Sequence, residues 1–182
     1  MKQIGFDLTG PIGSKATLGL VVLQADETLE QDFRRLFPDR GIAIYTSRIP
    51  SGDELSADSI AAMEAELPHA ARLLPRAARF DAVAYGCTSG TIALGEAETL
   101  ALIARSRPCR HQTTPVTASL AALAHLGARR VSILTPYRAE VNRALGDYYA
   151  SRGLEVLNVS GLDMDDDYAM TALHPDTLVS AG

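Results

Sequence analysis

The chain has 182 residues, of which 47% are hydrophobic and 21% charged, and a formal net charge of −5. This length allows one large domain or two smaller lobes, and the composition excludes a disordered chain. Lysine and arginine form no basic patch and no apolar run is long enough to cross a membrane, so we expect neither nucleic acid nor a membrane as a partner. Asp7 interrupts the N-terminal stretch where a signal peptide needs apolar residues, and we therefore expect a cytoplasmic protein.

Residues 1–16 are predicted to form an N-terminal arm. Within them, the sequence Gly-Pro-Ile-Gly-Ser-Lys at residues 10–15 superficially resembles a phosphate-binding loop. Its spacing does not match that loop, and an apolar strand follows where a helix is required. We interpret this stretch as a turn.

Apolar runs typical of buried parallel strands then alternate with helical patterns. The expected strands of the first part are residues 17–23, 41–47, 82–85 and a short one at 108–113. The expected helices are residues 27–37, 56–79 and 91–104, the second of which Pro68 and Pro75 should kink or break.

The second part begins with an expected helix at residues 114–126, which has Pro115 in its first turn and Gly127 after its end. Strands are expected at residues 130–134 and 153–159, helices at 139–150 and 173–180, and a solvated acidic loop at 163–167. Alternating strands and helices predict an α/β fold with parallel sheets. A strand, polar loop and helix begin at Leu18 and again at Val131, which suggests two Rossmann-like lobes facing each other across a cleft.

The stretch around Cys87 is the strongest candidate for a functional site. An apolar strand stops at Gly86, and Cys87, Thr88 and Ser89 lead into a helix. Strand-to-helix turns are where α/β proteins place their chemistry. The unpaired N–H groups of a helix N-terminus favour a thiolate and can bind an anion. Alternatively, Cys87 is a small apolar core residue.

The sequence Tyr-Gly-Cys-Thr-Ser-Gly-Thr at residues 85–91 resembles the first cysteine motif of the aspartate/glutamate racemase superfamily. The similar branch contains maleate isomerases, arylmalonate decarboxylases and maleate-isomerase-like proteins of ectoine utilisation. Residues 18–30 and 126–137, with Asn142, resemble its first strand and loop and the opening of its second half. The resemblance implies two lobes related by a pseudo-two-fold axis: residues 17–113 after the arm, and residues 114–182.

In the similar enzymes two cysteines, one from each lobe, lie on opposite sides of the substrate, and Cys87 corresponds to the first. The second belongs on a strand after the last expected helix, and this sequence ends at Gly182, so we expect the second lobe to be incomplete here. The resemblance implies that Thr88, Ser89 and Tyr137 bind a substrate carboxylate. Asp26 lies where maleate isomerases usually carry asparagine; an ionised aspartate cannot donate to a carboxylate, so a substrate with an amine or amide would suit it better. Alternatively, Asp26 caps the following helix.

These features predict a cofactor-independent, cysteine-based isomerase or racemase of a small carboxylate, which we expect to be a homo-oligomer. The alternatives are a decarboxylase of malonate-type acids, which the presence of Cys87 disfavours, and a non-catalytic carboxylate-binding protein. No nucleotide or pyridoxal motif occurs, and we expect neither cofactor nor metal. We interpret Cys109 as a structural thiol. The four histidines are not spaced as metal ligands; they are His69, His111, His125 and His174.

Overall fold

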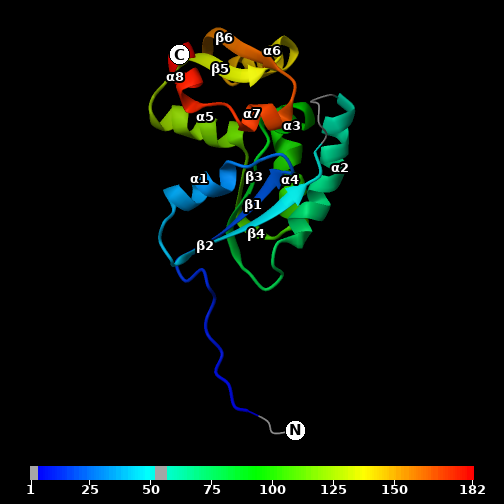
Figure 1. The fold of residues 1–182 in the computed structure, drawn as a ribbon, viewed down its shortest axis with the longest axis vertical. Coiled ribbons are helices and arrows are strands. Elements are labelled where there is room, and N and C mark those ends of the chain that lie inside the picture. Colours follow the sequence, from blue (N-terminus) through cyan, green and yellow to red (C-terminus); the bar gives the residue numbers. More distant parts are fainter. Residues whose placement is uncertain (1–3, 52–56) are drawn as a thin grey trace.

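The computed structural model describes residues 4–51 and 57–182 and has an α/β fold with parallel sheets (Figure 1). The first sheet has the strand order β2-β1-β3-β4 and all of its strands are parallel. Its strands are β1 (Ala16–Leu23), β2 (Ile42–Ile49), β3 (Phe80–Tyr85) and β4 (Cys109–Thr113). In the second sheet β5 (Arg130–Tyr137) pairs in parallel with β6 (Glu155–Met164). The predicted fold class is therefore confirmed.

Most helices lie in the connections between strands, and the last two follow the last strand of the described residues. They are α1 (Leu29–Leu36), α2 (Ala57–Leu73), α3 (Thr88–Leu94), α4 (Glu96–Ser106), α5 (Pro115–His125), α6 (Ala139–Ser151), α7 (Asp167–Thr171) and α8 (Pro175–Ala181). Helices α2 and α4 pack against each other beside the first sheet, and α1 contacts β2. Figure 1 shows β5, β6 and α6 to α8 gathered at the end of the molecule opposite the N-terminal arm.

Four details differ from the sequence predictions. The expected helix at residues 91–104 is two helices, because Gly95 has a φ of 92° that a right-handed helix cannot contain. Pro68 lies inside α2 without breaking it, whereas Pro75 follows the end of the helix at Leu73, as a helix-breaking residue should. The strands β2, β5 and β6 are longer than expected, and the acidic run 163–167 belongs to the end of β6 and the start of α7. The predicted start of the second helix at Ser56 lies outside the described residues.

The main hydrophobic core fills the space between the first sheet and helices α2 and α4. Val21 and Val83 of neighbouring strands are fully buried there, as are Leu67 and Ile103 of the two helices. Cys87 is also a member of this cluster, with 4% of its surface exposed. The packing of this core therefore fixes the position of the end of β3.

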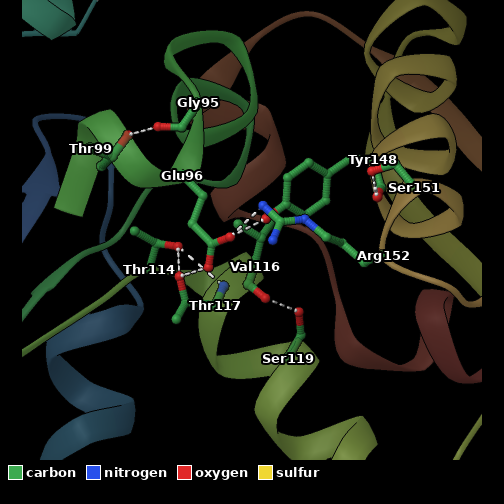
Figure 2. Close-up of polar contacts among 10 residues, drawn as sticks. All are labelled: Gly95, Glu96, Thr99, Thr114, Val116, Thr117, Ser119, Tyr148, Ser151 and Arg152. Carbon is green, nitrogen blue, oxygen red and sulfur yellow. Dashed lines mark hydrogen bonds and ion pairs between the residues drawn. The ribbon is translucent and has the colours of Figure 1, made fainter. Parts of the chain in front are cut away.

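A polar junction joins α4 to the elements that follow it (Figure 2). The Glu96 carboxylate at the start of α4 accepts hydrogen bonds of 2.7 Å from Thr117 of α5 and from Tyr148 and Arg152 at the end of α6. The Arg152 guanidinium also stacks 4.9 Å from the centre of the Tyr148 ring. One carboxylate thus connects the first lobe to the helix that packs on the second sheet.

Residues 4–15 precede β1 without regular secondary structure, and Figure 1 shows this arm extending away from the sheets. The side chains of Ile4, Phe6 and Leu8 in this arm are more than four-fifths exposed. Among the described residues, no helix has the length and apolar character needed to cross a membrane.

Candidate active site

Cys87 occupies the turn between β3 and α3. It is the N-cap residue of α3, with extended backbone angles, and its Sγ accepts a hydrogen bond of 3.3 Å from the Gly90 N–H. The preceding Gly86 N–H donates to the Val21 carbonyl at 2.8 Å, which ties the turn to the central strand β1. The sulfur is therefore held at the carboxyl end of the sheet, where ligand sites of parallel α/β folds lie.

The surroundings of the Cys87 thiol correct one prediction. Burial raises the pKa of this thiol, and hydrogen bonds from Ser89, the Gly90 N–H and Tyr85 lower it only in part. The acidic thiol was expected from the effect of the helix N-terminus alone, without the effect of burial. The desolvation of a side chain that is only 4% exposed outweighs those donors, so the resting group is a thiol rather than a thiolate.

Tyr85 contributes to the site although the sequence analysis assigned it only to a strand. Its hydroxyl hydrogen-bonds the Cys87 sulfur, and burial raises the pKa of the tyrosine well above its ordinary range. A Cβ atom on Gly90 would lie 2.7 Å from the Tyr85 hydroxyl and 3.1 Å from the Cys87 Sγ, so only glycine leaves room for this contact. The two residues are separated by one position in an extended segment, a spacing that points side chains to the same face and could have revealed the pair.

A cavity of about 460 Å³ opens in front of Cys87. All five site residues predicted from the sequence line this one cavity: Asp26, Cys87, Thr88, Ser89 and Tyr137. Apolar side chains from α7, α8 and the loop between them close another wall: Met170, Leu173 and Leu178. The structure therefore brings residues from both sheets to one hollow.

Tyr137 reaches the cavity from the end of β5. Its backbone is fixed by Asn142, whose side-chain amide donates to the Tyr137 carbonyl at 2.9 Å, and by the Thr135 hydroxyl, which accepts from the Tyr137 N–H at 3.0 Å. Burial raises the pKa of Tyr137 to about 12, with a smaller contribution from the Cys87 sulfur and a lowering by a hydrogen bond with Thr88. The phenol is therefore protonated and able to donate a hydrogen bond.

Asp26 has the capping role that the sequence analysis gave as its alternative. Its Oδ1 accepts hydrogen bonds of 2.9 Å from the N–H groups of Thr28 and Leu29, at the start of α1. Its side chain nevertheless lines the cavity, so the cap and a ligand contact are compatible.

Asp167 is a further residue of the cavity that its sequence pattern did not reveal. It was predicted to belong to a solvated acidic loop, but it is the first residue of α7, is half-buried and lines the cavity. Its burial, and to a smaller extent the charge of Asp166, raise the pKa of its carboxyl group. The charge of Asp167 in turn raises the pKa values of Cys87 and Tyr137, which shows that the three groups are near one another.

The remaining candidates lie outside this cavity. Cys109 is half-buried in β4 and its sulfur accepts a hydrogen bond of 3.2 Å from the Gln112 side chain, in keeping with a structural thiol. Within residues 4–51 and 57–182, no group of three or more histidine, cysteine or acidic side chains is arranged to hold a metal ion.

Comparison with known proteins shows the family of the chain. A family model described as arylmalonate decarboxylase matches residues 18–182. The chain belongs to this family. Arylmalonate decarboxylase of Bordetella bronchiseptica is 31% identical over 171 residues, which cover 91% of this chain and 68% of the relative. Maleate isomerase of Alcaligenes faecalis is 25% identical over 181 residues, which cover 89% of this chain and 69% of the relative.

Solved structures of the family have the same fold. The maleate cis-trans isomerase of Nocardia farcinica, in a mutant with a covalently bound succinylcysteine intermediate, aligns with a TM-score of 0.83 at 19% identity, over 91% of this chain and 71% of the other. A liganded double mutant of arylmalonate decarboxylase aligns with a TM-score of 0.79 at 26% identity, over 91% of this chain and 70% of the other. The chain is thus an enzyme of the cysteine-based isomerase and decarboxylase type, and its specific reaction is a separate question.

Proposed function

We propose that the protein is a cofactor-independent isomerase or racemase of a small carboxylate, with Cys87 as its nucleophile. The observation that carries the proposal is the convergence of the Cys87 thiol, the Thr88–Ser89 turn and Tyr137 on one cavity. A nucleophile beside hydrogen-bond donors is the arrangement that covalent catalysis on a carboxylic acid requires.

The donors bind the carboxylate. Tyr137 remains protonated, Thr88 and Ser89 line the same cavity, and the Ser89 hydroxyl lies 3.5 Å from the Cys87 sulfur. Hydrogen bonds to a charged acceptor stabilise binding by about 1.5–3 kcal/mol each. They would hold an adjacent carbon of the substrate close to Cys87.

With a cis-alkene acid as the substrate, the reaction would start from the protonated Cys87 thiol, because the pKa of this thiol is raised. The sulfur bonds to one alkene carbon while the thiol proton, carried by a cavity group, bonds to the other, and the π bond is lost. Rotation about the resulting single bond and loss of the same sulfur and proton regenerate the alkene in the trans form. The succinylcysteine in the Nocardia farcinica maleate isomerase mutant has the composition of such an adduct.

Decarboxylation of a malonate-type acid is the second candidate, since a family model and a 31% identical relative both carry that name. It differs from isomerisation in its product, because carbon dioxide leaves and a proton takes its place. Cys87 and Tyr137 both line the cavity, and either could supply this proton.

Product analysis tests the proposal. The purified chain is incubated separately with maleate, maleamate and phenylmalonate, and proton NMR follows the alkene and α-carbon signals. We expect isomerisation of a cis-alkene acid that falls at least about hundredfold in Cys87→Ala and is unchanged in Cys109→Ala. Decarboxylation alone supports the second candidate, and binding without turnover supports a carboxylate-binding protein.

A cytoplasmic location, a homo-oligomer and a place in ectoine utilisation belong to the same proposal. The location rests on Asp7, which interrupts the apolar stretch that a signal peptide needs, and the place in ectoine utilisation rests on the resemblance of the sequence at residues 18–30, 85–91 and 126–137.

A further inference from the structure

The cavity has an unusual charge for a site that binds an acid. Three aspartates line it: Asp26, Asp32 and Asp167. No lysine, arginine or histidine is among the described residues of its lining. A dianion in this cavity would meet like charges and no formal positive charge, which disfavours its binding.

The three aspartates are not equivalent. Asp32 is compensated by an ion pair with Arg35 at 3.2 Å, and Asp26 already accepts two backbone N–H groups with Oδ1. Asp167 has no hydrogen bond or ion pair of its side chain with any residue in the part of the chain that the structure describes. A half-buried carboxylate without a partner costs free energy, and such an exception in a cavity is typical of a group that binds a ligand.

The donors and acceptors of the cavity come from different elements of the fold. Thr88, Ser89 and Tyr137 present hydroxyl donors from the ends of β3 and β5. Asp26 and Asp167 present carboxylates from the loop after β1 and from the start of α7. A ligand that carries both a negative and a positive group can pair with the hydroxyl donors and with the carboxylates, whereas a dicarboxylate can pair only with the donors.

We infer that the substrate is a small carboxylate that also carries a cationic group, such as an ammonium, and that Asp167, assisted by Asp26, selects this group. The inference rests on the proposed function, because it assigns the ligand of the same cavity. Asp167 acts as a specificity-determining residue and Cys87 remains the reacting group.

Three probes of similar length test the inference: succinate with two negative charges, succinamate with one, and 4-aminobutyrate with one charge of each sign. Their dissociation constants are measured by calorimetric titration of the full chain. We expect 4-aminobutyrate to bind at least about tenfold more tightly than succinate, with succinamate between them.

The matched variants are Asp167→Asn and Asp163→Asn. Both remove one negative charge, but Asp163 is exposed and does not line this cavity. Asp167→Asn should weaken 4-aminobutyrate about tenfold and strengthen succinate, and Asp163→Asn should change neither. Retention of 4-aminobutyrate binding in Asp167→Asn would overturn the inference, because asparagine can replace a protonated aspartic acid but not an anion.

The experiments distinguish a failure of the proposed function from a failure of this inference. If the wild type binds succinate most tightly and Cys87→Ala still abolishes turnover, the inference is overturned and the isomerase proposal stands. If none of the probes binds and Cys87→Ala leaves turnover unchanged, both are overturned.

Discussion

Tyr137 hydrogen-bonds Thr88, the residue directly after Cys87, across the boundary between the two sheets. Tyr137 ends the strand β5, and Thr88 begins the helix α3 that follows β3. The contact fixes a donor from one lobe beside the nucleophile candidate of the other.

Tyr137→Phe should weaken binding of each carboxylate probe about ten- to hundredfold. The lost hydrogen bond to a charged acceptor contributes about 1.5–3 kcal/mol, and 1.4 kcal/mol corresponds to tenfold. Calorimetric titration measures the change, and thermal unfolding should show a fold that remains intact. The control is Tyr168→Phe, since Tyr168 is 44% exposed and lies outside the cavity lining. Equal binding by the wild type and Tyr137→Phe would contradict the assigned role.

Alkylation of Cys87 by iodoacetamide should be slow at neutral pH and should accelerate only above the ordinary range of a thiol. The reason is that only the thiolate reacts, while burial raises the pKa of Cys87. Cys109 is the internal reference because it is less buried, and peptide mass spectrometry resolves the two sites. Faster alkylation of Cys87 than of Cys109 at pH 7 would show that the helix N-terminus outweighs burial after all.

Tyr85→Phe should slow the alkylation of Cys87 further. The Tyr85 hydroxyl lowers the pKa of the thiol by a hydrogen bond, so its removal moves that pKa higher. The pH at which the alkylation rate reaches half of its maximum should rise. Tyr45→Phe is a matched control, because Tyr45 packs against the same core but does not contact the sulfur. An unchanged or lower midpoint in Tyr85→Phe would argue against the contact.

Gly90→Ala should displace the Tyr85 hydroxyl from the Cys87 sulfur. The added methyl group would lie 2.7 Å from that hydroxyl, and Tyr85 has only 2% of its surface exposed, so it has little room to move. Overpacking of this kind destabilises by about 1–3 kcal/mol. Chemical denaturation measures the loss, and Gly90→Ala combined with Tyr85→Phe should recover part of it. A double variant as unstable as the single one would place the strain elsewhere.

The convergence of Cys87, Thr88 and Tyr137 could be predicted from the sequence, because ligand sites lie at the carboxyl ends of parallel strands and the two lobes were expected to face each other across a cleft. The strands β3 and β5 that end at these residues both read clearly as apolar runs. The helix α5 was also predictable, since Thr114 caps it, Pro115 begins it and Gly127 follows its end with a φ of 66°. The start and end of this helix depend on residues that are neighbours in the sequence, so they can be predicted from the sequence alone.

The features that the sequence did not reveal depend on contacts between distant elements. Asp167 stands in a run of acidic residues that is typical of a solvated loop, and only the tertiary fold brings it into the lining of the Cys87 cavity. The thiol of Cys87 was misjudged for the same reason, because desolvation depends on the whole core. The break at Gly95 was hidden because a single glycine is compatible with an amphipathic helix, and only its positive φ divides α3 from α4.

The junction at Glu96 should make the stability of the protein depend on pH. Hydrogen bonds from Tyr148 and Thr117, and the charge of Arg152, lower the pKa of Glu96 below its ordinary value. A carboxyl group with a lowered folded-state pKa contributes stability that is fully present above its unfolded-state pKa of about 4.3 and is lost as the pH falls through the lower folded-state value.

Glu96→Gln should therefore destabilise the protein at pH 7, by about 1–2 kcal/mol, and by progressively less as the pH falls below about 4. Urea denaturation at several pH values measures this difference. The control is Glu98→Gln, which removes a similar charge from the same helix but breaks only an exposed pair with Arg105. Because Glu96 connects α4 to α6, its variant should also weaken binding in the Cys87 cavity, whereas Glu98→Gln should not. A destabilisation of equal size at pH 3 and pH 7 would show that the junction acts through packing and not through its charge.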